Sequence, residues 1–359
     1  MKYRLKIEKR MEGFTGNVVL ARIIAIVAAI ILTVIVLMIA GFEIAKIPRV
    51  FEKLFIDTLF TAKGLEKTIV KTIPLIFCAL GVAIAFRMKL WNIGGEGQFA
   101  MGAFASAGVA MAFPNMAAFP LILLMLVAGM LAGIIWAGIA GITKSLLGVN
   151  ETIVTLMLNY IALLWLQFLI IGPWKDPLQK GFPMAPIISE NGWLPSFGES
   201  NIHIGIIIAI VIAVIYYFVL NKSKWGYEVR AIGDGPKAAK YAGMNVKLNV
   251  ILVMTVSGAL IGLGGAIEIS GLSHRLEPDI SGGYGFTAVI IAWLAKLSPT
   301  AIIIMSVFMA ALAVGGKTMG VLQLPAAISA VIQGIILFCV LAFDFLTKYS
   351  IKFARKETV

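Results

Sequence analysis

The chain has 359 residues, of which 60% are hydrophobic and 13% are charged, and its formal net charge is +12. A soluble globular domain is only about 45–50% apolar, so this composition excludes a soluble protein and indicates a polytopic membrane protein. The positive charge does not indicate nucleic acid, because the basic residues mostly flank apolar segments, where they set orientation and contact anionic lipid. Both cysteines, Cys78 and Cys339, lie in apolar runs, so we expect no disulfide framework.

The N-terminal segment 1–65 predicts a basic tail, an anchor helix and an external amphipathic segment. The apolar run at 18–42 is longer than the roughly 7–15 apolar residues of a signal peptide, so we interpret it as an uncleaved anchor. The stretch 43–67 has apolar residues at helical spacing and is expected to lie along the outer membrane interface.

Nine further candidate membrane helices follow along the chain. They lie at 68–86, 92–113, 118–142, 152–172, 203–220, 248–271, 285–297, 299–316 and 325–346. With a cytoplasmic N-terminus, about two thirds of the 30 lysines and arginines fall on the cytoplasmic side, as the positive-inside rule requires. The sequence therefore predicts an all-α, multi-pass membrane protein of about ten helices. Its core is 66–346, its cytoplasmic tail is 347–359, and both termini are cytoplasmic.

Two polar segments between the helices are long enough to carry function. Residues 172–201 contain five prolines and predict an ordered external loop, whereas 221–247 is expected to face the cytoplasm. Neither segment is large enough to hold an enzyme domain. Any energy source must therefore be a gradient or another subunit.

A Gly-Gly-x-Gly pattern occurs twice, at 94–97 and 282–285, and each copy opens a predicted helix. The predicted topology puts the first copy on the inner side and the second on the outer side. An inverted repeat of four helices, 68–172 and 248–346, would produce this arrangement. Glycines also let helices pack closely in lipid without any repeat, and both interpretations stay open.

No catalytic or metal-binding motif is evident in the sequence. The stretch GGKT at 315–318 lacks the earlier glycine of a phosphate-binding loop, because Ala311 stands at that position. His203 and His274 have no acidic or Cys neighbours at metal-ligand spacing. No Ser-His-Asp or paired-carboxylate site is suggested among the spans, so enzymatic chemistry is not indicated.

Polar side chains inside the predicted spans are candidates for a translocation pathway, because such groups are costly in a bilayer unless they are paired or face water. Glu96 either faces a pathway or is held by the free N–H groups of a broken helix. On the fifth predicted helix, Thr152, Thr155 and Asn159 form a polar stripe, which either bonds a neighbouring helix or lines a pore. Glu268, near the outer end of its helix, is expected to reach the interface. The candidate pathway residues are Asn92, Gly94, Gly95, Glu96, Thr152, Thr155 and Asn159.

The cytoplasmic loop also specifies a short helix at 236–242. Asp234 and Gly235 suit the N-cap region, Pro236 suits the first helical position, and Gly243 suits the left-handed residue after the helix. Lys237 and Lys240 are expected on one face. The opposite, small-residue face would comprise Ala238, Ala239, Tyr241 and Ala242. We interpret this face as a plug for a groove on a cytoplasmic partner; the alternative is a surface helix resting on its own bundle or on lipid headgroups.

Four stretches resemble the signature sequences of a known family: KLWNIGGEGQFAMGAF (89–104), GVNETIVTLMLNYIA (148–162), AIGDGPKAAKYAGMNV (231–246) and SGLSHRLEPDISGGYGF (270–286). They are similar to permease subunits of ABC importers in the ribose and branched-chain amino acid class. The likeness is strongest to the bacterial nucleoside uptake permeases, in the longer of their two permease subunits. It covers about 66–346, whereas the first 65 residues match only as an anchor helix with a variable loop.

The resemblance implies the ABC importer permease fold in a bacterial inner membrane. It implies a second homologous permease as a heterodimer partner, a cytoplasmic ABC ATPase that binds ATP and Mg, and an extracytoplasmic substrate-binding lipoprotein. No cofactor is expected on this chain, and the capped segment Asp234–Gly243 is implied to be the coupling helix docked into the ATPase. The substrate is then expected to be a nucleoside. The alternatives are ribose or another simple sugar, and a gradient-driven secondary transporter, which usually needs a deep ionisable relay.

Overall fold

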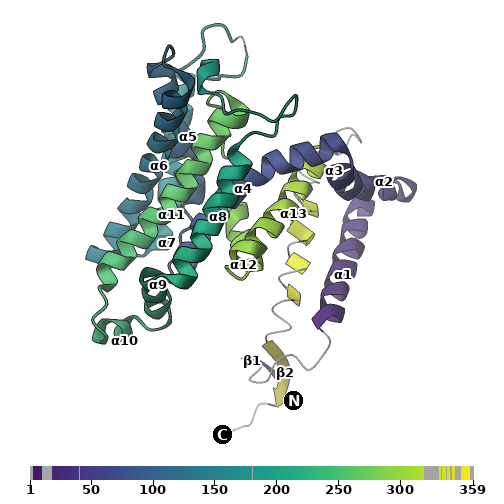
Figure 1. Cartoon of the computed structure of the whole chain (residues 1–359). Coiled ribbons are helices and arrows are strands. Elements are labelled where there is room, and N and C mark those ends of the chain that lie inside the picture. Colours follow the sequence, from purple (N-terminus) through teal and green to yellow (C-terminus); the bar gives the residue numbers. More distant parts are fainter. Residues whose placement is uncertain are drawn as a thin grey trace. The chain divides into compact units, whose positions relative to one another are not determined.

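The computed structural model describes residues 3–9, 18–39, 41–179, 181–318 and 349–355, and scattered positions between 331 and 343. The chain divides into two compact units (Figure 1). Unit 1 comprises Met1–Gly64 and Ala311–Val359, and unit 2 comprises Leu65–Ala310. The tenth predicted helix, at 325–346, lies largely outside the described residues.

The segments that the sequence predicts to be an anchor and an amphipathic stretch are helical. The first is α1 (Val18–Ile39), and the second begins as a series of short helices. These are η1 (Ile44–Lys46), α2 (Ile47–Phe51), the π-helical turn η2 (Glu52–Ile56) and α3 (Asp57–Phe60). The buried side chains in this series are Ile47, Val50, Leu54 and Thr58. Their spacings of three and four residues place them on one helical face.

A two-stranded antiparallel ribbon joins the two ends of the chain. Strand β1 (Tyr3–Lys9) pairs with β2 (Tyr349–Arg355), with Tyr3 opposite Arg355 and Lys9 opposite Tyr349. The prediction of an all-helical chain missed this ribbon, although both segments alternate apolar and polar residues in the manner of strands. The pairing places both ends of the chain on the same side of any membrane that the protein crosses.

Unit 2 contains the helices that carry the candidate site. They are α4 (Ala62–Arg87), α5 (Gly95–Ala112), α6 (Ala118–Ile142), α7 (Glu151–Ile171), α8 (Gly205–Lys222), α9 (Lys224–Asp234), α10 (Pro236–Tyr241), α11 (Val246–Glu268), α12 (Tyr284–Leu294) and α13 (Pro299–Thr318). Two of them continue into π-helical turns: α6 into η3 (Thr143–Leu147) and α11 into η5 (Ile269–Ser273). Helices α4 and α13 extend a few residues beyond the boundaries of this unit.

Six helices in the described part of the chain are long and apolar enough to cross a membrane: α4, α6, α7, α8, α11 and α13. The apolar stretch Val27–Ile39 of α1 and the whole of α12 are shorter. The sequence-based expectation of a multi-pass helical membrane protein is therefore confirmed. Helix α5 is rich in Gly and Ala and is not among the six.

The core of unit 2 is built around α4. Every residue from Thr72 to Phe86 is buried, including Pro74 inside the helix. Helices α6, α7 and α8 instead expose many large apolar side chains. An apolar exterior suits a lipid environment, because lipid tails are as apolar as leucine.

Helices α6 and α11 approach each other through glycines. Gly129 and Gly133 on α6 face Gly258 and Gly262 on α11, and each pair is spaced by four residues. A Cβ atom on Gly133 would overlap the carbonyl oxygen of Gly258, and one on Gly258 would overlap that of Gly133. Close packing of helices through small residues is therefore what these four glycines provide.

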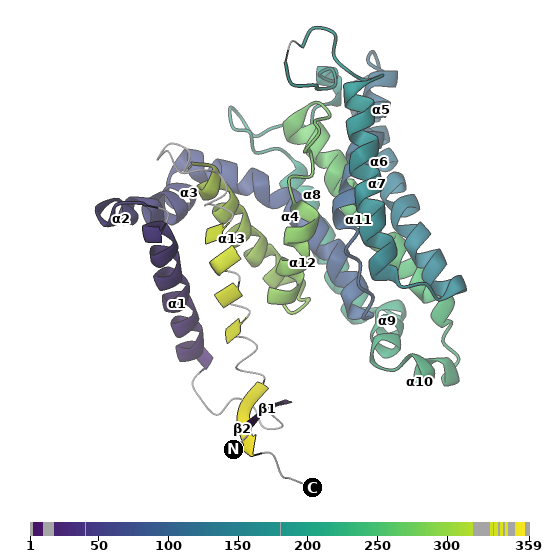
Figure 2. The same cartoon turned by 180° about the vertical axis from the view of Figure 1, so that it is seen from behind.

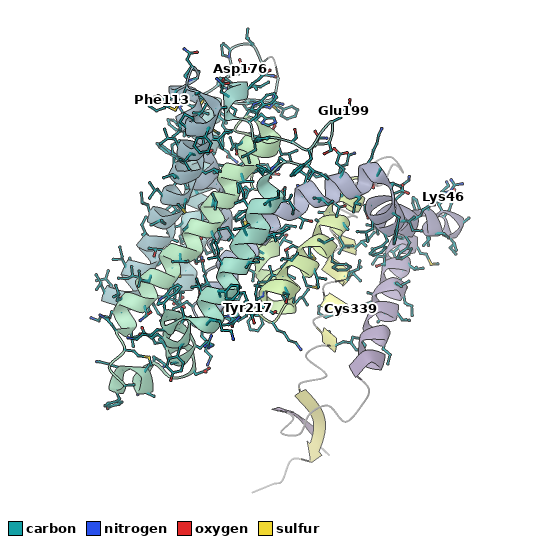
Figure 3. All side chains as sticks on the ribbon, viewed as in Figure 1. Lys46, Phe113, Asp176, Glu199, Tyr217 and Cys339 are labelled. Atoms are coloured by element: carbon teal, nitrogen blue, oxygen red, sulfur yellow. The ribbon has the colours of Figure 1, made fainter. Side chains whose placement is uncertain are left out.

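The two polar loops lie at opposite ends of unit 2. Phe113 at the end of α5 and Asp176 in the loop after α7 lie together at one end (Figure 3). Helices α9 and α10 lie at the other end in both views (Figures 1 and 2). The loop at 172–201 packs on the end of α11: the backbone N–H of Leu194 donates to the carbonyl oxygen of Ser270 at 2.7 Å, and that of Ile188 donates to His274 at 2.8 Å.

Candidate functional site

A non-helical segment between α4 and α5 is held by a buried hydrogen-bond network around Asn92. The Asn92 side-chain amide donates to Gln98 Oε1 at 3.1 Å and to Ser257 Oγ at 2.8 Å. Its Oδ1 atom accepts from the backbone N–H of Gly94 at 3.0 Å and from Gln98 Nε2 at 2.9 Å. Ser257 Oγ donates in turn to the carbonyl oxygen of Gly81 at 2.6 Å. The network therefore fastens this segment to α4 and α11.

The polar stripe of α7 bonds the same segment. Asn159 accepts from the backbone N–H of Gly97 and donates to the carbonyl oxygen of Ile93, both at 2.8 Å. Thr155 Oγ1 accepts from the Ile93 N–H at 3.3 Å. The sequence left open whether the stripe bonds a neighbouring element or lines a pore, and Thr155 and Asn159 bond a neighbouring element. Thr152 is only partly buried.

The start of α7 adds a charged contact to this arrangement. Asn150 caps the helix by accepting from the Thr152 N–H at 2.9 Å. Glu151 forms an ion pair with Lys144 at 2.8 Å and also accepts from the backbone N–H of Trp91 at 3.3 Å. The segment that precedes α5 is therefore bonded by three residues of α7: Glu151, Thr155 and Asn159.

Glu96 joins the two Gly-Gly-x-Gly copies. Its side chain is 3% exposed, and its two carboxylate oxygens accept from the backbone N–H groups of Gly283 and Gly285, each at 2.8 Å. These N–H groups lie at the start of α12, where Gly283 is the N-cap residue. The sequence suggested that a broken helix would hold the carboxylate. In the structure the donors are the N–H groups of α12 and not those of the glycines beside Glu96.

Sequence reasoning missed a second contact cluster, which surrounds Tyr284. Lys71 Nζ donates to the Tyr284 hydroxyl at 2.6 Å, and that hydroxyl donates to Glu268 Oε1 at 3.3 Å. The ring of Phe99 meets the Tyr284 ring edge-on at 5.4 Å between centroids. The lysine inside an apolar span was a signal that could have revealed this cluster. Glu268 is buried in it, so the expectation that Glu268 reaches the interface was wrong.

The short helix in the 221–247 loop exists and ends as predicted. It is α10, with Pro236 at its first position and Gly243 in the left-handed conformation at φ +83°. Gly243 N–H donates to the carbonyl oxygen of Lys240, and Met244 N–H donates to that of Ala239, both at 3.1 Å, which completes a Schellman motif. The N-cap is Gly235.

Asp234 does not cap α10. It is the last residue of α9, and its carboxylate lies 3.6 Å from Lys89 Nζ in an exposed pair.

The predicted small-residue face of α10 is wrong. Ala239 is 4% exposed and packs in a cluster with Ala85, Ile232 and Val250 of its own chain, whereas Tyr241 is 94% exposed. Two residues along an α-helix are about 200° apart, so Ala239 and Tyr241 cannot share a face. The side chains that α10 leaves exposed include Lys237, Ala238, Lys240, Tyr241 and Ala242.

Helix α9 rests on the end of α4, and α10 packs on α9 and α11. A Cβ atom on Gly233 would lie 2.5 Å from the carbonyl oxygen of Arg87, so α9 touches the backbone there. The Arg87 guanidinium donates to Asn221 Oδ1 at 3.2 Å and to the carbonyl oxygen of Leu297 at 3.0 Å. Met88 and Leu90 belong to the same apolar cluster as Ala239. The apolar cluster that contains Ala239 of α10 therefore also contains residues of the segment that leads to Asn92 and α5.

The two histidines lie near the opposite end, beside the 172–201 loop. His274 stacks on Trp193, with ring centroids 4.1 Å apart. Burial, together with a smaller effect of the neighbouring His274, lowers the pKa of His203 to about 4. The described residues contain no group of three or more His, Cys, Asp and Glu side chains that could hold a metal ion.

Comparison with known families identifies the family of this chain. The family described as "Branched-chain amino acid transport system / permease component" matches residues 64–341. The chain belongs to this permease family. The match extends from the start of α4 beyond α13 and includes the two Gly-Gly-x-Gly helix starts and α10. The permease is thus a membrane component of a transport system.

Three curated relatives are similar over most of their length. The nucleoside ABC transporter permease protein NupB of Lactococcus lactis is 33% identical over 89% of this chain and 90% of its own. The guanosine ABC transporter permease protein NupP of Bacillus subtilis is 34% identical over 85% and 86%. The glucose ABC transporter permease protein TsgB13 of Haloferax volcanii is 33% identical over 84% and 82%. No solved structure matches the chain.

Proposed function

We propose that the permease forms part of the membrane pathway of an ATP-driven importer for nucleosides. The observation that carries this proposal is the similarity to permeases named for nucleosides and for guanosine over at least 85% of the chain. The buried polar side chains do not select between substrates, because Asn92, Thr155, Asn159 and Glu96 form their hydrogen bonds within the permease.

The competing substrate class is a simple sugar. A permease named for glucose matches at 33% identity, close to the value for the nucleoside-named relatives. Both substrate classes are therefore measured in one assay.

The uptake assay uses the complete complex in proteoliposomes. Labelled guanosine, uridine, ribose, glucose and leucine are supplied in parallel. ATP is supplied on the side of the membrane that carries the ATPase. We expect ATP-dependent accumulation of guanosine or uridine and background accumulation of leucine. Accumulation of glucose or ribose without either nucleoside would contradict the nucleoside assignment and leave the permease class unchanged.

The proposed partners are a cytoplasmic ABC ATPase, a second related permease and an extracytoplasmic binding lipoprotein. The relatives are permeases of ABC transporters, a class that takes its energy from ATP. GGKT at 315–318 is the end of helix α13 and does not form a strand–loop–helix phosphate site. Helix α10, fixed to the bundle through Ala239 and exposing Lys237 and Tyr241, is the proposed ATPase contact.

The proposed topology places the N- and C-terminal strands and α10 in the cytoplasm and the 172–201 loop outside. The bias of basic residues and the opposite positions of the two loops support it. The ten-helix inverted repeat belongs to the same proposal. Direct contact between the two Gly-Gly-x-Gly helix starts shows that the expectation of one copy on the inner side and one on the outer side was wrong.

Reporter fusions test the topology. We expect fusions after Val359 and within 221–247 to score as cytoplasmic, because basic residues are retained on that side. Fusions within 175–200 should score as external. A cytoplasmic score for the 175–200 fusions would contradict the topology, and the inverted repeat would then be wrong as well.

A further inference from the structure

We propose that Glu96 is a positioning residue that joins α5 and α12 into one rigid body, so that the two helix starts move together during transport. The inference goes beyond the proposed function, because it concerns which parts of the permease move relative to each other. It depends on that function only where uptake is the measured quantity.

The first support is the bonding of the carboxylate. Both oxygens of Glu96 accept a backbone N–H of α12 at 2.8 Å, in a site from which water is nearly excluded. Hydrogen bonds to an ionised group are shorter and stronger than neutral ones. Opening the contact would leave a buried carboxylate and two buried N–H groups without partners, which is strongly unfavourable. The contact is therefore expected to stay closed throughout the cycle.

The second support is the fit of the two backbones. A Cβ atom on Gly95 would lie 3.2 Å from the Cα atom of Gly285, and one on Gly285 would overlap the backbone nitrogen of Glu96. No side chain separates the helix starts at this point. The glycines thus bring the N–H groups of α12 within reach of a glutamate that belongs to the first turn of α5.

The third support is a second contact between the same elements, nearer the far end of α12. The rings of Trp91, which precedes α5, and Trp293 on α12 lie 5.7 Å apart between centroids. Phe86 of α4 contacts both, at 5.3 Å and 5.9 Å. Helix α12 therefore contacts α5 at its start, through Glu96, and contacts the segment before α5 near its end, through Trp293.

The two tryptophans offer a direct test, because Trp91 is 45% and Trp293 is 50% exposed. In the assembled complex, the double variant Trp91→Cys/Trp293→Cys is treated with a short bifunctional maleimide. The same variant treated with a monofunctional maleimide is the matched control. The native Cys78 is fully buried, and the two single-cysteine variants report any cross-link to Cys78 or Cys339.

If α5 and α12 move together, the cross-linked permease should import substrate within about twofold of the monofunctional control. Loss of uptake on cross-linking, with uptake retained in the control, would overturn the proposal, since it would mean that the two elements must separate. If the unmodified complex also shows no uptake, the result contradicts the proposed function and not the rigid body. The yield of the cross-link itself can be measured without uptake.

The role of Glu96 itself is tested through those yields, measured in membranes without substrate. Glu96→Gln offers one acceptor oxygen and opposes an N–H donor with another donor. It should lower the cross-linking yield between positions 91 and 293 several-fold. Glu96→Asp keeps the charge and should restore part of the yield. An unchanged yield in Glu96→Gln would contradict a positioning role. An equal loss of yield in Glu96→Asp and Glu96→Gln would contradict it as well, because a loss that does not depend on the charge indicates a general packing defect.

Discussion

Replacing Tyr241 by aspartate is expected to abolish ATP-driven uptake while the permease still folds and inserts. Tyr241 is 94% exposed on α10, so its own chain loses almost no packing when the ring is removed. Tyrosines at the centre of protein interfaces commonly contribute about 2 kcal/mol or more, which is roughly a thirtyfold change in affinity. The measurement is the amount of ATPase that copurifies with the tagged permease, together with the thermal stability of the isolated permease.

Ala239→Asp is the matched control for the Tyr241 variant, because it places the same residue type two positions earlier on the same helix. Ala239 is buried in an apolar cluster with Val250 and Ile232, so an aspartate there would be an unpaired charge inside the permease and should cost several kcal/mol. We expect this variant to lower the stability of the permease itself. Full ATPase recovery with Tyr241→Asp would show that α10 does not dock through its exposed face.

Gly133→Ala is expected to disrupt the packing of α6 on α11 and to cause a large loss of thermal stability in detergent. The added methyl group would overlap the carbonyl oxygen of Gly258, which is backbone and cannot move aside independently. Either the two helices separate or one of them bends, and both responses lose contacts along the whole interface. Overpacked positions of this kind typically cost about 1–3 kcal/mol and occasionally more.

The control on the same helix is Gly138→Ala. A Cβ atom on Gly138 would lie 3.4 Å from the Thr255 side chain, which is an ordinary contact distance. Alanine is favoured over glycine inside a helix by about 1 kcal/mol, so this variant should be as stable as the parent or more stable. Equal stabilities for Gly133→Ala and Gly138→Ala would contradict the glycine-mediated contact.

The helices of this protein could be predicted because their signals are local. Long apolar runs located α4, α6, α7, α8 and α11, and the residues Pro236 and Gly243 correctly bounded α10. The packing of α10 could not be predicted in the same way. The sequence alone did not indicate that Ala239 would meet Val250 and Met254, and the grouping of Tyr241 with Ala239 neglected the helical rotation between them.

The candidate site shows a similar division. The sequence indicated that Glu96 needs partners, because a buried carboxylate is costly. It could not supply their identity, since Gly283 and Gly285 are almost 190 positions away along the chain. The Lys71 and Tyr284 contact was missed for the same reason. The terminal ribbon was missed because pairing between chain ends leaves only a weak alternation in each segment.

The pairing of β1 with β2 has a consequence for the order of events during synthesis. The segment from Tyr3 to Lys9 leaves the ribosome well before its hydrogen-bonding partner, Tyr349–Arg355. The ribbon can therefore form only after the helices between its two strands have been translated. Until residues 349–355 are made, the edge of β1 has no partner strand, so the closed ribbon distinguishes chains that contain β2 from chains that stop before it.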